Sequence, residues 1–380
     1  MSFISAHKIR HFWHYFKMDT VLFLLLIALI GFGFVVLYSA SAGSIQTLYK
    51  QMIHFALGLL AMMIIAQIPP YQMRRYSPYL MFFGVFLLLL TLLFGVKSGG
   101  AQRWLDLGFL RFQPSEIMKI IVPIAIASIL SEKTLPPKPL PILISIVSIS
   151  IIVLLIAKQP DLGTSILIGA SGIYVLFFSG VSIRLLKNPW LNFGLILSSI
   201  GAIIYVAWNY FLMAYQKTRI LTLIDPSSDP LGSGYHILQS KIAIGSGGLF
   251  GKGFEQGSQS QLDFLPEHAT DFIFAVLAEE MGFLGVILLL SIYGLIIYRS
   301  LLISFQSEDS FSKLLGASLT LIFFTYIFVN ISMVSGLLPV VGVPLPMVSY
   351  GGSSLITLML SFGIIMSINK HKTPRYLQKI

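Results

Sequence analysis

Asp271 is the acidic residue whose position best suits chemistry. It closes the polar stretch Phe264-Leu-Pro-Glu-His-Ala-Thr-Asp271 and directly precedes a long apolar run. A carboxylate held on a rigid element beside cations suits a general base, although an acid here would also cap the following helix. Glu267 lies four residues earlier, next to His268. These residues could bind a metal, but no second histidine accompanies them, which argues against one.

Two other acids stand where apolar segments begin. Glu116 and Lys119 are three residues apart and therefore share one helix face. They form either a buried ion pair between helices or part of a binding site, because ionisable groups in or beside membrane spans mark function or internal pairing. Asp161, in Lys158-Gln-Pro-Asp-Leu-Gly-Thr164, would cap the helix that it precedes or contribute to the same site.

The composition requires that these groups be held by membrane-spanning helices. Of the 380 residues, 56% are apolar and only 11% are charged, and the mean hydropathy is +0.86. An average soluble domain is about 25% charged, so this composition excludes a soluble globular protein. The chain contains no cysteine, which excludes disulfides, thiolate zinc sites and cysteine nucleophiles.

The apolar runs predict an all-α, polytopic membrane protein with about ten spans. The first run follows a basic stretch and lacks a cleavage site, so we expect it to remain as a span. The expected spans are 20–40, 51–68, 77–96, 114–130, 140–157, 162–181, 190–212, 271–297, 314–337 and 347–368. They form a single transmembrane domain over residues 1–380, and an even number of spans places both termini on one side.

The distribution of Lys and Arg predicts the orientation. About 15 of the 25 basic residues lie in the terminal segments 1–19 and 369–380 or in alternate connections between spans. By the positive-inside rule this face is cytoplasmic. The long connection 213–270 is therefore outside the cytoplasm, between spans seven and eight, and loops of this length are usually functional.

Basic residues on the outer face run against the positive-inside rule and need another explanation. They are Lys97, Arg103, Arg111, Lys158, Lys217, Arg219, Lys241 and Lys252. Scatter and lipid headgroup contacts explain some of them, but together they also suit an anionic group such as a diphosphate. Trp104, beside Arg103, would lie at the depth of the membrane interface. The glycine-rich segment 247–253 does not have the spacing of a phosphate-binding loop.

Several motifs of the chain resemble the SEDS family (shape, elongation, division and sporulation), and the resemblance runs from near Thr20 to the C-terminus. The motifs are Ala101-Gln-Arg-Trp104, Gln113-Pro-Ser-Glu-Ile-Met-Lys119, Gln159-Pro-Asp-Leu-Gly163, Tyr215-Gln-Lys-Thr-Arg219, Asp225-Pro, Asp229-Pro, Gly234 to Gly248, Phe264-Leu-Pro-Glu267 and Pro339 to Ser353. The compact length and the stretch 337–344 resemble the elongation branch more than the division branch.

The resemblance implies a peptidoglycan glycosyltransferase that polymerises lipid II in the bacterial cytoplasmic membrane during elongation. It also implies a class B penicillin-binding protein and the elongation complex as partners, and no nucleic acid. The family's catalytic aspartate maps onto Asp271. The family usually has His-Thr-Asp there, whereas this chain has Ala269-Thr-Asp271, with His268 one place earlier.

On this interpretation Asp271 is the base, and nearby cations stabilise the departing diphosphate. The candidate substrate-binding residues are Arg103, Trp104, Glu116, Lys119, Asp161, Arg219, Lys241 and Glu267. A divalent cation, Mg²⁺ or Mn²⁺, would bridge the diphosphate without a protein metal cage. Two other functions stay open: a transporter that flips lipid II, and a scaffold without activity.

Overall fold

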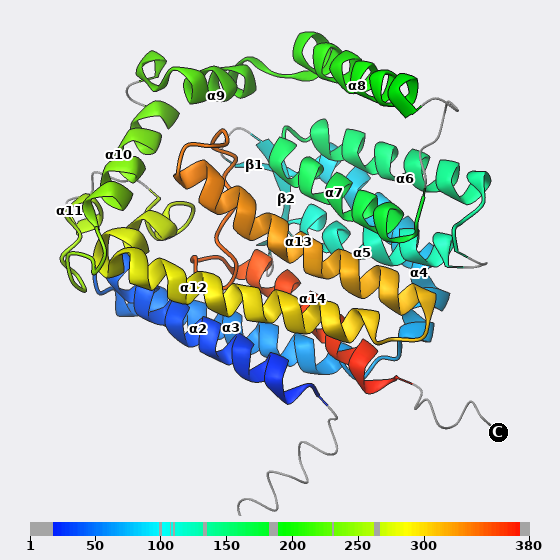
Figure 1. Ribbon diagram of the computed structural model, residues 1–380, viewed down its shortest axis with the longest axis horizontal. Helices are drawn as coiled ribbons and strands as arrows, with labels where there is room; N and C mark the ends of the chain where they lie inside the picture. The colour runs from blue at the N-terminus through cyan, green and yellow to red at the C-terminus, as the bar shows by residue number, and fades with distance from the viewer. Residues whose placement is uncertain are drawn as a thin grey trace, which may run out of the picture.

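The computed structural model describes residues 18–98, 101–106, 108, 111–131, 135–181, 189–229, 232–261 and 267–372. The described part is a bundle of long helices (Figure 1). A helix lies at each of the ten predicted segments: α2 Thr20–Ala40, α3 Ile45–Ile65, α4 Pro70–Phe94, α5 Pro114–Leu130, α6 Pro139–Ala157, α7 Leu162–Phe178, α8 Pro189–Val206, α12 Ile273–Phe305, α13 Ser310–Val334 and α14 Gly352–Lys370. The chain is thus a multi-pass, all-α membrane protein. The largest differences from the predicted boundaries are α4, which begins seven residues earlier, and α12, which continues to Phe305.

Seven of the described helices are long and apolar enough to cross a membrane, namely α2, α3, α4, α6, α12, α13 and α14. The apolar α7 is shorter, with 17 residues. The count of ten spans therefore stays a prediction. The domain limits and the sidedness of the loop stay predictions as well.

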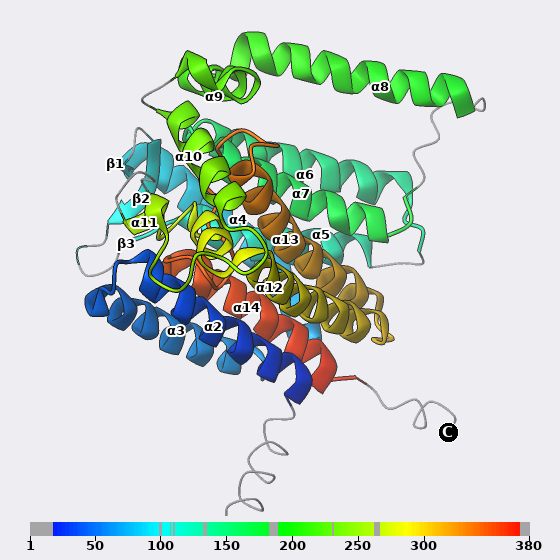
Figure 2. The same cartoon turned by 60° about the vertical axis from the view of Figure 1, so that its left-hand side comes forward.

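Helix α13 is central to the bundle and packs against α12, α7, α5, α14, α10 and α4. Helix α5 is also almost fully buried, between α4, α7, α13 and α6. In both views α8 lies at one edge of the bundle and α2 with α3 at the opposite edge (Figures 1 and 2). The charged residues Glu116 and Lys119 of α5 are therefore held among helices.

The first and the last described helices meet at one end of the bundle. Asp19 caps α2, and its carboxylate accepts hydrogen bonds from the guanidinium of Arg299 at 2.6 and 3.1 Å. Nδ2 of Asn369, near the end of α14, donates to the same carboxylate at 3.3 Å. The start of α2 and the end of α14 therefore lie on one side, as an even number of spans requires.

A small antiparallel sheet precedes α5 and was not part of the predicted all-α fold. It contains β1 Val96–Ser98, β2 Ala101–Asp106 and β3 Arg111–Phe112 in the order β1-β2-β3. Strand β2 contacts α4 and α5. It places Arg103 and Trp104 next to the end of the bundle where α5 begins.

The long connection contains η1 Ala207–Phe211, α9 Ala214–Ile224, η2 Pro226–Ser228, α10 Ser233–Ser246 and α11 Ser258–Gln261. Apolar residues recur at helical spacing over 237–244, a pattern that suits an amphipathic helix lying on the membrane. The helix is present as α10, but Ile237 and Ala243 are buried and α10 packs on α12. Packing against the bundle therefore accounts for Ile237 and Ala243, whereas Leu238 and Ile242 of the same helix are 44% and 52% exposed.

The glycine-rich segment 247–253 pairs with a break in α12. Gly282 interrupts that helix with φ 65° and ψ −163°. The backbone N–H of Lys252 donates to the carbonyl of Glu279 at 2.9 Å, and that of Phe283 donates to Gly248 at 2.9 Å. The break divides α12 into a short part that follows Asp271 and a long apolar part.

Candidate active site

A cavity of about 140 Å³ lies where β2, α5, α7, α13 and the start of α14 meet the segment 341–344. Its charged lining residues are Arg103, Glu116, Lys119 and Asp161. The structure thus brings together four of the candidate residues, from three separate motifs. Two cations and two carboxylates in one polar cavity are an arrangement that binds a polar or anionic ligand rather than an apolar one.

Glu116 and Lys119 share one face of α5, as their spacing predicted, and they pair with each other within this helix rather than between two helices. Nζ of Lys119 lies 2.5 Å from Oε1 of Glu116, and both side chains are buried. The ammonium also lies 4.9 Å from the centre of the Tyr326 ring, in cation–π geometry. Within the described residues, Oε2 of Glu116 is buried without a hydrogen-bond partner. That oxygen remains available to a donor from a bound molecule.

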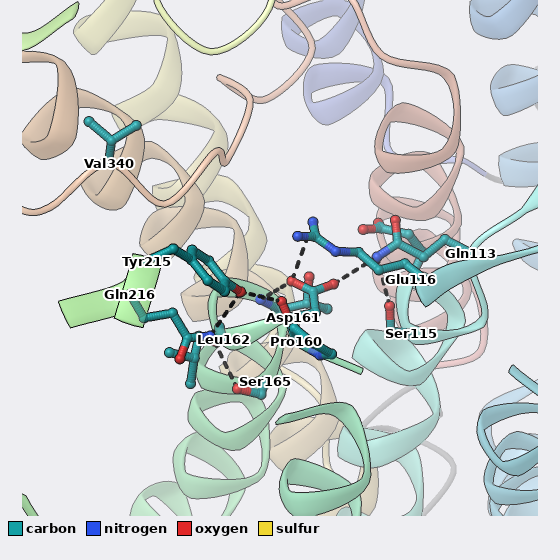
Figure 3. A network of polar contacts seen from close by, with 12 residues as sticks. Gln113, Ser115, Glu116, Pro160, Asp161, Leu162, Ser165, Tyr215, Gln216 and Val340 are labelled. Carbon is teal, nitrogen blue, oxygen red and sulfur yellow. Dashed lines mark hydrogen bonds and ion pairs between the residues drawn. The ribbon is translucent and has the colours of Figure 1, made fainter. Parts of the chain in front are cut away.

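Asp161 caps α7, as its position predicted, and also lines the cavity. Its Oδ1 accepts a hydrogen bond from the backbone N–H of Thr164 at 3.3 Å. Its Oδ2 accepts one from Nε2 of Gln113 at 3.0 Å (Figure 3). Nη1 of Arg103 lies 3.8 Å from Oδ1. The side chain of Arg103 is 34% exposed. Arg103 is therefore paired more loosely than Lys119.

Asp271 reaches the wall of this cavity from the side of α12. It does not cap the helix, because α12 begins at Ile273 and its N-cap is Phe272. Oδ2 of Asp271 lies 3.3 Å from the position that a Cβ would take on Gly342, which lines the cavity. Burial and, to a smaller extent, the nearby Glu267 raise the pKa of Asp271, Arg219 lowers it, and the net result is a pKa of about 6. A carboxyl with such a pKa is ionised at neutral pH and still accepts a proton readily.

The other candidate residues lie around the cavity and do not line it. Arg219, on α9, donates from Nη1 to the carbonyl of Val340 at 3.0 Å. Lys241 lies against Gly336, after the end of α13. Trp104 is half-buried on β2, and Glu267 is exposed and accepts a hydrogen bond from Oγ1 of Thr270 at 2.6 Å. Of the predicted cations outside the cavity, Arg219 is therefore the one that acts on Asp271.

Three residues of the site were not assigned a role from the sequence. Gln113 links the start of α5 to Asp161, Tyr326 covers Lys119, and Gly342 is the cavity-lining residue that lies against Asp271. Gln113 and Gly342 stand in motifs that resemble the SEDS family. Tyr326 lies in the middle of an apolar span, where a hydroxyl-bearing side chain was the available signal.

A family model matches almost the whole chain. The model of the FTSW_RODA_SPOVE family, described as a cell cycle protein, matches residues 19–374. The chain belongs to the FtsW/RodA/SpoVE family. The resemblance of the motifs to the SEDS family is thereby confirmed.

Curated members of the FtsW/RodA/SpoVE family match almost the whole chain. Peptidoglycan glycosyltransferase MrdB of Escherichia coli (strain K12) is 50% identical over 363 residues, which are 96% of each protein. The probable peptidoglycan glycosyltransferase FtsW of Trichlorobacter lovleyi is 34% identical over 366 residues, 92% of this chain and 93% of its own. The higher identity to MrdB agrees with the predicted elongation branch.

Solved structures of the FtsW/RodA/SpoVE family share the fold. A chain of a peptidoglycan synthase complex that coordinates polymerization and crosslinking matches with a TM-score of 0.79 and 31% identity, covering 93% of this chain and 98% of its own. The rod shape determining protein RodA of Thermus thermophilus matches with a TM-score of 0.70 and 27% identity, covering 94% and 98%.

Proposed function

We propose that this protein is a peptidoglycan glycosyltransferase of the elongation type, which polymerises lipid II into glycan strands. The observation that carries the proposal is the 50% identity, over 96% of the chain, to a protein named peptidoglycan glycosyltransferase. The geometry supports it, because Asp271 lies at the wall of a cavity lined by two cations and two carboxylates. A base beside a charged cavity suits a group transfer with an anionic leaving group.

In the reaction, a sugar hydroxyl attacks the anomeric carbon of the glycan donor. The hydroxyl loses its proton to Asp271, a new glycosidic C–O bond forms, and the bond between the anomeric carbon and the diphosphate breaks. Undecaprenyl diphosphate leaves with the bonding electron pair. The pKa of about 6 suits Asp271 to this task, because the carboxylate is ionised at neutral pH.

The leaving diphosphate needs positive charge close to it. Arg103 is the cation of the cavity most available for this role, because it is partly exposed and 3.8 Å from Asp161. Lys119 is already neutralised by Glu116. Arg219 is near enough to Asp271 to lower its pKa and would act from the outer side. Lys241 would contribute only by leaving its contact with Gly336. Charge stabilisation of this kind is usually the larger part of catalysis.

The described residues do not fit a divalent cation held by the protein. They contain no group of three or more His, Asp or Glu side chains placed to hold a metal ion. Glu116 and Asp161, the acids of the cavity, already face Lys119 and Arg103. The divalent cation predicted from the family resemblance would therefore have to arrive with the substrate, and no catalytic step is assigned to it.

The setting that suits this reaction is the bacterial cytoplasmic membrane. The seven long apolar helices support a multi-pass protein. The start of α2 and the end of α14 meet at one side, and the positive-inside rule supports a cytoplasmic location for that side. A class B penicillin-binding protein is the proposed partner, within the elongation complex. The likeness to a chain of a peptidoglycan synthase complex supports an assembly of this kind.

The test is to give the purified protein labelled lipid II with no other polymerase present. We expect long glycan products, with release of undecaprenyl diphosphate. The same protein in sealed vesicles separates the alternatives. Labelled lipid that crosses the bilayer without polymer would indicate a transporter, and neither signal would indicate a scaffold. Depletion in cells separates the two branches, since loss of the elongation enzyme gives round cells and loss of the division enzyme gives filaments.

A further inference from the structure

The turn that leads into α12 is fixed through its backbone. In the segment 269–271, each of the three main-chain carbonyls accepts a hydrogen bond from another part of the chain. The carbonyl of Ala269 accepts from the backbone N–H of Tyr350 at 2.9 Å. The carbonyl of Thr270 accepts from Oγ of Ser349 at 2.5 Å. The carbonyl of Asp271 accepts from Nδ2 of Asn330 at 2.8 Å. Non-helical backbone with every carbonyl paired is held in one conformation.

Asn330 connects Asp271 to the wall of the cavity. Its side-chain amide, fully buried in α13, donates a second hydrogen bond to the carbonyl of Val343 at 2.7 Å. Val343 follows Gly342, whose Cβ position lies 3.3 Å from Oδ2 of Asp271. One amide group therefore sets the distance between the base and the cavity wall.

Ser349 forms a second connection of the same kind. Its Oγ donates to Thr270 and accepts a hydrogen bond from the backbone N–H of Leu345 at 2.8 Å. The carbonyl of Ser349 accepts from Nε2 of Gln51 on α3 at 3.3 Å. This hydroxyl thus joins the turn before α12 to the segment before α14, which α3 braces from behind.

We propose that Asn330 and Ser349 are positioning residues, which hold the carboxylate of Asp271 against Gly342 so that it meets the acceptor hydroxyl in reactive geometry. The inference rests on the proposed function for its catalytic consequence. Asn330 and Ser349 carry no charge, and neither of them lines the cavity. A misplacement of about 1 Å can cost on the order of 100-fold in rate, so losing either connection is expected to slow the reaction.

The pKa of Asp271 is a readout that a purely structural role of Asn330 and Ser349 would not change. In the described part of the chain, Glu267 on its own turn and Arg219 on α9 act on its pKa. From α10, the ring of His236 lies against that of Phe272, with the ring centres 5.7 Å apart and the planes tilted by 35°. Burial is the largest cause of the raised pKa. A loosened turn would let the carboxylate reach water and would move its pKa towards the ordinary value of 3.8.

The experiment compares Asn330→Ala and Ser349→Ala with wild type and with Ser318→Ala. Ser318 is a matched control, since its Oγ, buried in the same helix, donates to the carbonyl of Ser171 at 2.8 Å. We expect each test variant to lose at least about tenfold in kcat with KM changed less than about twofold. The acid limb of the pH–rate profile should move to lower pH, whereas Ser318→Ala should keep the wild-type profile.

Infrared titration of the Asp271 carboxyl, identified by difference from Asp271→Asn, separates the two proposals. We expect the pKa of Asp271 to fall in both test variants, whether or not any polymer forms. An unchanged carboxyl pKa and an unchanged kcat would overturn the positioning role. If the pKa of Asp271 fell in the variants but even the wild-type protein made no polymer, the connection would stand and the proposed function would be rejected. Should Asn330→Ala fail to fold, Ser349→Ala carries the same test.

Discussion

Oδ2 of Asp271 lies 3.3 Å from the position of a Cβ on Gly342, so the base and the cavity wall meet at a residue without a side chain. Gly342 also has φ +78°, a conformation that costs other residues about 1–2 kcal/mol. Gly342→Ala should therefore push the carboxylate away and reduce polymerisation by on the order of tenfold or more. The rate of glycan formation and the thermal midpoint, measured together, check this. An alanine variant with wild-type activity would show that the contact has no catalytic importance.

The buried pair of α5 should control stability. Lys119→Ala would leave the carboxylate of Glu116 buried without its cation, and removal of one partner of a buried pair typically costs about 3–5 kcal/mol. The double variant Lys119→Met with Glu116→Gln removes both charges and should recover most of this loss. Thermal unfolding in detergent measures both. If the two variants unfolded at the same temperature, the pair would not be coupled as its 2.5 Å distance indicates.

The break in α12 should tolerate no side chain. A Cβ on Gly282 would lie 2.3 Å from the backbone nitrogen of Gly251, and the φ of +65° adds strain. Gly282→Ala should therefore separate the segment 247–253 from α12 and lower the thermal midpoint. Gly294→Ala in the same helix is the control, because nothing lies within 4 Å of its Cβ position. Alanine is the better helix former there, so a neutral or slightly stabilising effect is expected. Equal effects of the two substitutions would contradict this account of the break.

The raised pKa of Asp271 has a consequence for stability. The folded protein holds this proton up to about pH 6, whereas the unfolded chain releases it near 3.8. The folded state therefore binds more protons between these values, and the contribution of Asp271 to stability falls as the pH rises through them. Asp271→Asn should be more stable than wild type above about pH 6 and nearly equal below about pH 4. A variant that is less stable at neutral pH would contradict the burial of a charged group here.

Local spacing allowed parts of the site to be predicted from the sequence. The three-residue separation of Glu116 and Lys119 is enough to place them on one helix face, and the structure joins them. The position of Asp161 before an apolar segment likewise predicted its role as a cap. In both cases the partner atoms lie within one helical turn, so no knowledge of the tertiary fold was needed.

Contacts between distant segments could not be obtained in this way. The position of Lys241 against Gly336 depends on how α10 packs, and the spacing of residues in the long connection does not define that packing. Asn330 contacts Asp271 across 59 positions of sequence. The strand β2 was also missed, although Gly99-Gly100 before it is a pair typical of hairpins. Apolar periodicity indicates which segments cross the membrane and carries less information about the polar connections.

The measurement that tests the central claim most directly is glycan polymerisation from labelled lipid II by purified Asp271→Asn. Asp106→Asn is the matched control, because Asp106 is an aspartate of the sheet region that pairs with Arg111 and lies outside the cavity lining. We expect Asp271→Asn to be folded, at least as stable as wild type at neutral pH, and without polymer, while Asp106→Asn polymerises normally. Near-normal polymer from Asp271→Asn would contradict the assignment of this carboxylate as the base.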